Sequence, residues 1–213
     1  MQQSWDRHWK ERHDINPSAA SWSKRRVVSV LERYVRPPMS VLDAGCGTGF
    51  FSRFFQSMGC RVCCLDYSMD ALDIARHTTD GLCSAYIQRD LLCSETAEGM
   101  RETYDVIFSD GLLEHFDLAD QKRILRGFRR MARPGGMVIT VVPNRYSSWQ
   151  LIRPLVMPGI REKPFVFREL RKLMTDQTIV ESGGLNVLPF RWSPDRILGK
   201  RVGMLLYCVG RYA

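Results

Sequence analysis

The sequence predicts an α/β fold in which a mostly parallel, doubly wound sheet carries helices on both faces. Three observations support this prediction. Apolar strand-like segments alternate with amphipathic helical segments along most of the chain, as parallel sheets require. A glycine-rich turn joins the first strand to the helix after it, and the 213 residues suffice for one good core but are short for two.

Seven short segments have the composition of strands. The first five follow one another in alternation with helices, and the last two give the end of the chain a β-rich character. The predicted strands are 39–44, 60–65, 83–88, 104–108, 137–142, 185–192 and 203–212.

Helical spacing of apolar residues predicts the helices between these strands. Two of them precede the first strand, and Pro37-Pro38 ends the second of these two. After Pro143 the pattern loosens into a loop with Pro154, Pro158 and Pro164. The predicted helices are 4–12, 18–36, 50–58, 68–77, 120–132 and 167–174.

Composition places few limits on function. No apolar stretch approaches the roughly 20 residues of a membrane-spanning helix, and the polar start lacks an apolar secretory region, so a cytoplasmic location is expected. Seven cysteines suit reduced thiols better than a disulfide framework, and no second pair completes the zinc half-site of Cys60 and Cys63, so no metal is expected. The net charge of +8 is compatible with nucleic acid, an anionic membrane surface or an anionic substrate.

The turn Gly45-Cys46-Gly47-Thr48-Gly49 occupies the place where parallel sheets collect ligands. Glycines let the backbone approach a ligand closely, and the helix that follows points free N–H groups at a negative group. Phe50 stands where a dinucleotide-binding fingerprint has its third glycine, which weakens a nicotinamide assignment. Asp66 ends the second predicted strand, where a carboxylate can accept hydrogen bonds from both hydroxyls of an adenosine ribose.

The run from Val41 to Gly49, Val-Leu-Asp-Ala-Gly-Cys-Gly-Thr-Gly, closely resembles the first motif of class I (Rossmann-like) S-adenosylmethionine-dependent methyltransferases. The resemblance continues through Asp66 to Met69, Asp90-Leu91, Asp105 to Phe116 and Arg133 to Gly136. It implies S-adenosylmethionine as cofactor, S-adenosylhomocysteine as product, and a sheet of seven strands whose last is antiparallel. It further implies one methyltransferase domain over 1–213, with a helical cap at 1–38, a cofactor-binding core at 39–143, and a substrate-side insertion and C-terminal strands at 144–213.

The resemblance also assigns cofactor contacts. The backbone of the glycine turn would hold the methionine end, Asp66 the ribose, and Tyr67 or Met69 would cover the adenine. Asp90 and the Leu91 amide would read the adenine edge by two hydrogen bonds, and the end of the fourth strand would line the floor near the sulfonium. The implied cofactor-binding residues are Asp43, Ala44, Gly45, Cys46, Gly47, Gly49, Asp66, Tyr67, Met69, Asp90, Leu91, Asp110 and Gly111.

His115 is the candidate catalytic residue. A hydroxyl or protonated amine must lose a proton on methylation, and histidine is the commonest base near neutral pH. Relatives carry a similar Leu-Glu-His segment after the fourth strand. Because relatives with different chemistries share it, a structural role for His115, joining that strand to the next helix, stays open.

Candidate substrate or lid residues lie at both ends of the predicted core. Trp5 and Trp9 belong to the N-terminal helices, which fold over the cofactor in related enzymes; a buried helical stripe is the alternative. Tyr146, Trp149 and Arg153 belong to the 144–164 insertion, where apolar residues mixed with arginines suit an acidic, aromatic or lipid-like small molecule.

Two other functions stay open. The stretch from Arg123 to Arg133 holds five arginines and no acid, which is compatible with an RNA substrate, although no RNA-binding module is present. A catalytically inactive S-adenosylmethionine-binding scaffold is the second alternative. Peripheral contact with a membrane is possible, and the oligomeric state is not predicted.

Overall fold

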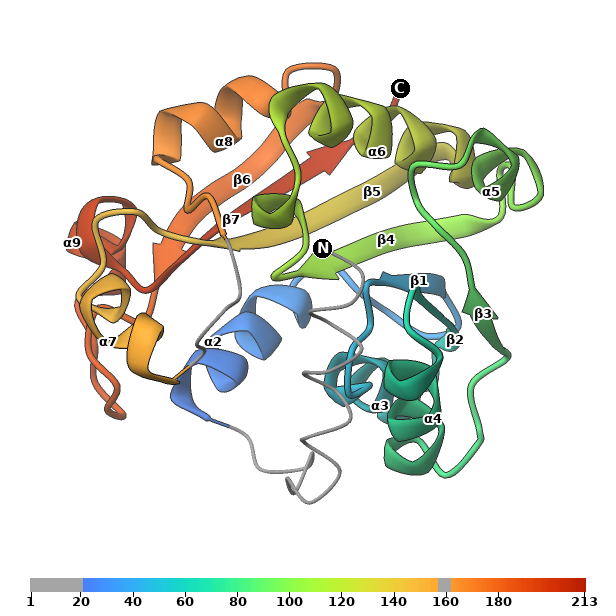
Figure 1. Cartoon of the computed structure of the whole chain (residues 1–213), viewed down its shortest axis with the longest axis horizontal. Helices are drawn as coiled ribbons and strands as arrows, with labels where there is room; N and C mark the ends of the chain where they lie inside the picture. The colour runs from blue at the N-terminus through green and yellow to red at the C-terminus, as the bar shows by residue number, and fades with distance from the viewer. Residues whose placement is uncertain (1–20, 157–161) are drawn as a thin grey trace.

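Seven strands form one sheet, in the order β3-β2-β1-β4-β5-β7-β6 (Figure 1). The computed structural model describes residues 21–156 and 162–213. All neighbouring pairs are parallel except those of β7, which runs antiparallel to both β5 and β6. The predicted fold class, with its last strand antiparallel, is therefore confirmed. The strands are β1 (Ser40–Ala44), β2 (Arg61–Asp66), β3 (Ala85–Gln88), β4 (Tyr104–Asp110), β5 (Ala132–Pro143), β6 (Thr178–Leu185) and β7 (Leu205–Arg211).

Helices cover both faces of this sheet. In Figure 1, α5, α6 and α8 lie above it, and α2, α3 and α4 lie below it. The longer helices are held by an apolar stripe at helical spacing; in α6, for example, Ile124, Phe128 and Met131 are buried. The helices among the described residues are α2 (Trp22–Leu31), α3 (Phe50–Ser57), α4 (Met69–Thr78), α5 (Ser94–Glu98), α6 (Leu118–Met131), α7 (Trp149–Val156), α8 (Phe167–Leu173) and α9 (Asp195–Val202), with a short 3-10 helix η1 (Leu113–His115).

The helices before β1 match the prediction in part. The first predicted helix, at 4–12, lies outside the described residues. The second ends at Leu31, earlier than predicted, and turns lead from there to Pro37-Pro38. Ser21 begins α2 by accepting a hydrogen bond from the Lys24 amide.

The prediction of a strand at 185–192 is wrong. The strand lies at 178–185, and the chain then forms a loop and the helix α9. Gly183 and Gly184 made the true strand look unfavourable, because glycine weakens a strand in general. Here both are required by close contacts: a Cβ on Gly183 would lie 2.6 Å from the Tyr207 ring, and one on Gly184 would lie 2.0 Å from the Gly199 carbonyl oxygen.

The predicted loop after Pro143 contains α7. Pro154 lies within this helix, where its ring removes one backbone donor, so the segment reads as irregular from sequence. The short α5 was also missed, because five residues give no clear periodicity. Among the described residues, no helix combines the length and apolar character needed to cross a membrane.

Candidate functional site

The glycine turn between β1 and α3 lies against the end of β2. The amides of Gly45 and Cys46 both donate to the Leu65 carbonyl oxygen, at 2.8 and 3.1 Å. Gly45, Gly47 and Gly49 have φ of 71°, 51° and 74°, a region that side chains disfavour. A Cβ on Gly49 would also lie 2.8 Å from the backbone of Ala75 in α4. The backbone path of this turn therefore requires glycine.

Two carboxylates flank this turn. Asp66 ends β2, and its two oxygens accept hydrogen bonds from the amides of Gly47 (3.0 Å) and Ser68 (2.9 Å). Asp43 is buried in β1 and accepts a hydrogen bond from the Ser52 hydroxyl at 2.6 Å. Burial raises the pKa of Asp43 to about 7. The hydrogen bond of Asp43 thus links β1 to α3, and the two amides fix the orientation of the Asp66 carboxylate at the edge of the site.

The end of β3 lies beside Asp66. The Arg89 amide donates to the Asp66 carbonyl oxygen at 3.1 Å, which brings the next two residues, Asp90 and Leu91, to the same edge of the sheet. The Asp90 carboxylate is exposed and accepts a hydrogen bond from the Leu92 amide at 2.8 Å. Met69, three residues after Asp66 at the start of α4, is 51% exposed. The predicted adenine-binding residues therefore gather around the ends of β2 and β3.

Asp110 and Gly111 end β4 on the other side of the glycine turn. The Gly111 amide donates to the Val141 carbonyl oxygen at 3.0 Å, so this strand end is held against β5. Burial raises the pKa of Asp110 to about 6, although the nearby Lys24 ammonium acts to lower it. Asp110 is thus an acid whose charge changes in the range of ordinary buffers.

Lys24 is a site residue that the sequence analysis missed. It projects from α2, and its ammonium lies 4.2 Å from the centre of the Phe50 ring, the first residue of α3. Burial lowers its pKa, with Asp110 acting in the opposite direction. The sequence offers no signal that separates Lys24 from Arg25 and Arg26, because only the packing of α2 shows which of them faces the turn.

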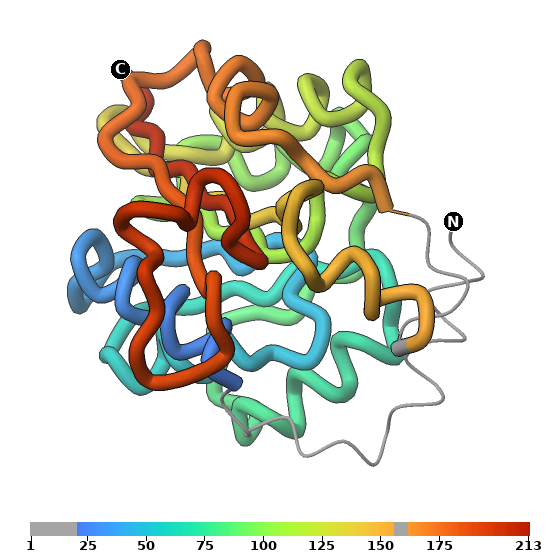
Figure 2. Tube along the Cα trace, turned by 90° about the vertical axis from the view of Figure 1, so that its left-hand side faces the viewer, coloured from blue at the N-terminus to red at the C-terminus, as the bar shows by residue number. Residues whose placement is uncertain are grey.

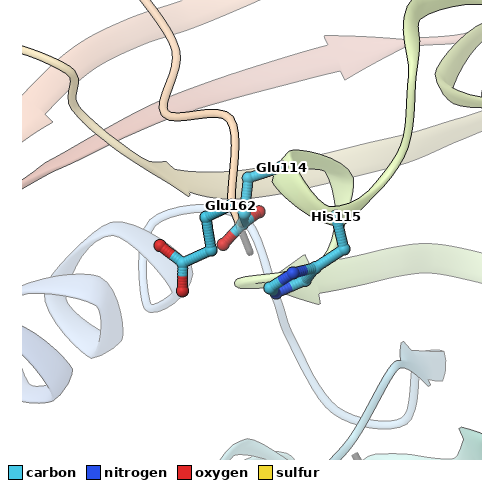
Figure 3. Close-up of side chains that lie close together, drawn as sticks. All are labelled: Glu114, His115 and Glu162. Atoms are coloured by element: carbon cyan, nitrogen blue, oxygen red, sulfur yellow. The ribbon is translucent and has the colours of Figure 1, made fainter. Parts of the chain in front are cut away.

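A second cluster follows β4 on η1. Glu114 and His115 come from this short helix, and Glu162 comes from the segment before α8 (Figure 3). One ligand atom from each side chain lies within 4.8 Å of the other two. Leu112, at the start of this segment, packs over the glycine turn, because a Cβ on Gly45 would lie 3.0 Å from its side chain. The cluster is therefore adjacent to the predicted cofactor site.

Glu114 is the most unusual member of this cluster. Its side chain is buried, and one carboxylate oxygen has no hydrogen-bond partner among the described residues. Burial raises the pKa of Glu114 well above its ordinary value. The main chain is fixed by the Lys163 amide, which donates to the Glu114 carbonyl oxygen at 2.8 Å.

Arg153 connects the predicted substrate insertion to this cluster. Its guanidinium lies 3.4 Å from the Glu162 carboxylate, and both side chains are largely buried. The other predicted insertion residues are not brought together in the same way: Tyr146 is exposed, and Trp149 is half-buried. Trp5 and Trp9 lie outside the described residues.

The cluster has two chemical uses. An imidazole between two carboxyl groups can accept and hold a proton. Two carboxylates and an imidazole can also ligate a divalent cation, which the sequence analysis did not expect. The cluster was missed because Glu162 is distant in sequence and only the fold brings it to η1.

The residues at the strand ends fit S-adenosylmethionine. A turn that leaves no room for Cβ atoms permits close approach of a ligand to the backbone. Asp66 is oriented by two amides, and a carboxylate accepts several hydrogen bonds, so a ribose diol is a suitable further donor. Fold and site together define a Rossmann-like protein that binds an adenosine-containing cofactor.

Comparison with known proteins narrows this class. A family model described as a methyltransferase domain matches residues 41–136. The ubiquinone biosynthesis O-methyltransferase of Pseudomonas savastanoi pv. phaseolicola is 33% identical over 145 residues, which cover 66% of this chain and 58% of that protein. The enzyme of the same name from Pseudomonas putida is 33% identical over 152 residues, 70% of this chain and 61% of that protein. The chain thus spans about three fifths of the length of these relatives.

Solved structures agree on the fold. An S-adenosylmethionine-dependent methyltransferase from Anabaena variabilis superposes with a TM-score of 0.74 at 21% identity, covering 99% of this chain and 94% of that one. The N-methyltransferase NodS from Bradyrhizobium japonicum, in complex with S-adenosylhomocysteine, gives 0.70 at 18% identity, covering 99% and 97%. The chain carries a methyltransferase domain on the class I S-adenosylmethionine-dependent methyltransferase fold, and S-adenosylmethionine is the cofactor that this domain and its site fit.

Proposed function

We propose that this chain transfers a methyl group from S-adenosylmethionine to a hydroxyl group of a small acidic, aromatic or lipid-like molecule. The observation that carries the proposal is the position of His115. A ring nitrogen of His115 lies within 4.8 Å of a carboxylate oxygen of Glu114, on η1, and of Glu162, from the segment before α8 (Figure 3). Leu112, which precedes η1, packs over the glycine turn. The names of the Pseudomonas relatives, which are O-methyltransferases of ubiquinone biosynthesis, support a hydroxyl acceptor.

Cofactor binding in this proposal uses the four strand ends. Asp66 accepts from the ribose hydroxyls, while Asp90 and the Leu91 amide bind the adenine edge beside Tyr67 and Met69. The backbone of the glycine turn contacts the methionine end, and Lys24 pairs with its carboxylate. The bound cofactor supplies an electrophilic methyl group, so these residues need only fix its direction and exclude water.

Acceptor binding uses the other cluster. The acceptor hydroxyl gives its proton to the His115 imidazole as its oxygen attacks the methyl carbon. Burial raises the pKa of Glu162, while the Arg153 guanidinium, 3.4 Å away, favours the ionised form that stabilises the resulting imidazolium. Burial raises the pKa of Glu114 and so favours its protonated form, which can donate a hydrogen bond to the acceptor oxygen.

The alternative of an RNA substrate has less support. The arginines of the 123–133 stretch lie mostly on α6, which runs antiparallel to the strands, so its arginine-rich end lies at the edge opposite the site. Three of them have partners: Arg130 pairs with Glu98 at 3.3 Å, Arg133 pairs with Asp105 at 2.9 Å, and the Arg129 guanidinium lies 5.7 Å from the Tyr212 ring centre. These arginines do not border the site.

The test is methyl transfer from radiolabelled S-adenosylmethionine to a panel of hydroxylated aromatic acids, prenylated phenols and RNA. We expect label in a phenolic acceptor, and His115→Asn should lower kcat by about 10²–10⁴-fold while S-adenosylhomocysteine binds as before. His77→Asn, an exposed histidine on α4, is the matched control.

Three outcomes would contradict the proposal. Label in RNA alone would favour the nucleic-acid alternative, and cofactor binding without any acceptor would favour a scaffold. A rate that is equal in His115→Asn and wild type would remove His115 from the reaction. The rate of methyl transfer is also measured after a chelator is added and again after Mg²⁺ is supplied. A rate that falls and then recovers indicates that the cluster binds a metal, and an unchanged rate indicates that it acts by accepting a proton.

A further inference from the structure

Helix α9 presents apolar side chains to solvent while its inner face is held rigidly. Gly199 packs backbone to backbone on Gly184 of β6, where a Cβ on either residue would lie about 2 Å from the other's carbonyl oxygen. Asp195, at its start, accepts from the Asn186 and Val187 amides at 2.9 Å and pairs with Arg26 at 2.8 Å. These contacts therefore fix which face of α9 points to solvent.

Three neighbouring segments share this apolar character. They are α7, α9 and the loop of residues 186–193, and together we call them the apolar rim. They follow the carboxyl ends of β5 and β6, and Figure 2 shows all three on the same side of the molecule. Large apolar side chains of the rim that are exposed are Leu151 (82%), Ile152 (51%), Leu155 (84%), Phe190 (62%), Trp192 (71%), Ile197 (81%), Leu198 (39%) and Val202 (41%).

Scattered exposed apolar residues are common, but a group of this size marks an interaction surface. Cations are interleaved with the apolar side chains in the same stretch. Arg191, Arg196, Lys200 and Arg201 are all exposed, and the acid among them, Asp195, is already paired with Arg26. The stretch from Phe190 to Val202 therefore combines an aromatic pair, aliphatic side chains and a positive charge.

We propose that the apolar rim docks on the surface of an anionic lipid bilayer. Aliphatic and aromatic side chains enter the boundary between headgroups and acyl chains, while arginines and lysines beside them contact anionic headgroups. A second copy of this chain fits less well, because like charges would meet across the interface. Nucleic acid would use the cations but leave the leucine and isoleucine side chains in water.

The rim also adjoins the acceptor side of the proposed active site. Arg153 of α7 points inward to Glu162, while Leu151 and Leu155 of the same helix are exposed. A lipid-like acceptor in the bilayer would therefore approach His115 from the side of α7. This last step rests on the proposed function, whereas bilayer docking itself does not.

The test is flotation of the 213-residue chain with vesicles of phosphatidylcholine alone or mixed with phosphatidylglycerol, with no acceptor present. We expect binding to the anionic vesicles that weakens with salt. Arg196→Gln with Lys200→Gln should weaken it about 30-fold, since each cation near an anionic surface contributes roughly fivefold. Ile197→Gln with Leu155→Gln should weaken it by a further factor of at least about 10.

Matched controls come from exposed residues elsewhere on the chain. Arg123→Gln with Arg126→Gln on α6 controls for charge, and Leu82→Gln, which is 70% exposed, controls for apolar surface. Binding of S-adenosylhomocysteine by every variant shows that each is folded. Equal loss of vesicle binding in the controls, no vesicle binding by wild type, or a dimer in solution that the rim variants abolish would overturn the proposal.

Discussion

Asp110 ends β4 at the position that the family resemblance implies for the floor near the sulfonium, and its charge changes in the pH range of ordinary buffers. Its pKa is raised to about 6 by burial, so it is protonated at low pH and ionised above pH 7. S-adenosylmethionine carries a positive sulfonium, and S-adenosylhomocysteine carries a neutral sulfide in its place. A nearby carboxylate should therefore distinguish the two ligands only when it is ionised.

We predict that the affinity for S-adenosylmethionine, relative to S-adenosylhomocysteine, rises by about fivefold to tenfold between pH 5 and pH 7.5. One unit of pKa change corresponds to about 1.4 kcal/mol, or tenfold in affinity. The two ligands share their amino, carboxylate and adenosine groups, so the effect of pH on the binding of those groups cancels in the ratio of the two affinities. Calorimetry at several pH values measures the ratio, and Asp110→Asn should make it independent of pH.

The exposed Asp73 on α4 supplies the control, since Asp73→Asn should leave the pH dependence intact. A ratio that stays constant with pH in wild type would show that Asp110 does not lie near the sulfonium.

At the scale of single elements, two glycines differ in the space that a Cβ atom would have. Gly184 in β6 has no room for a Cβ, because the Gly199 carbonyl oxygen would lie 2.0 Å away. Gly127 in α6 has ample room, since the nearest atom to a new Cβ is Ala97 Cβ at 3.8 Å. The same substitution at the two positions is therefore a direct test of how β6, α9 and α6 are placed.

Gly184→Ala should destabilise the chain by about 3 kcal/mol through overpacking, because α9 must move away from β6. Gly127→Ala should stabilise it by about 0.5–1 kcal/mol, because alanine favours the helix and restricts the unfolded chain. Urea unfolding of both variants and wild type measures these differences. If Gly184→Ala were as stable as wild type, the pairing of β6 with α9 would be wrong.

The sequence was sufficient to predict those elements whose local pattern is strong. β1, α3, β2 and α4 appear close to their expected bounds, because apolar runs and the glycine turn leave little choice of conformation. β6 was misplaced because the reason for Gly183 and Gly184 is tertiary: Tyr207 and Gly199 fill the space next to them. α7 was missed because Pro154 interrupts its helical pattern.

The same division holds for the site. Asp66 was predicted from its place at the end of a strand, and Asp90 and Asp110 from the resemblance to the methyltransferase family; all three lie at the carboxyl edge of the sheet. Lys24 and Glu162 were not predicted, since their positions depend on how α2 and the segment before α8 pack. Packing between segments that are distant in sequence, and not the local sequence pattern, brings these residues to the site.

At the scale of the whole molecule, the residues proposed for the cofactor and those proposed for the acceptor lie at different strand ends along the carboxyl edge of the sheet. The ends of β1, β2, β3 and β4 carry the residues proposed for the cofactor, and η1 and the segments after β5 carry those proposed for the acceptor. The glycine turn, with Leu112 packed on it, lies between the two. This arrangement brings a methyl donor and an acceptor hydroxyl together at one place.

Titration of S-adenosylmethionine, S-adenosylhomocysteine and NAD into the purified chain by calorimetry, with Asp66→Ala alongside wild type, tests the central claim most directly. We predict that the first two bind at micromolar concentrations and that NAD does not. Asp66→Ala should weaken binding by about 10- to 100-fold, the usual loss for a hydrogen-bonded carboxylate. Absence of binding by both methyl-donor ligands would contradict the assignment of this site as a methyltransferase cofactor site.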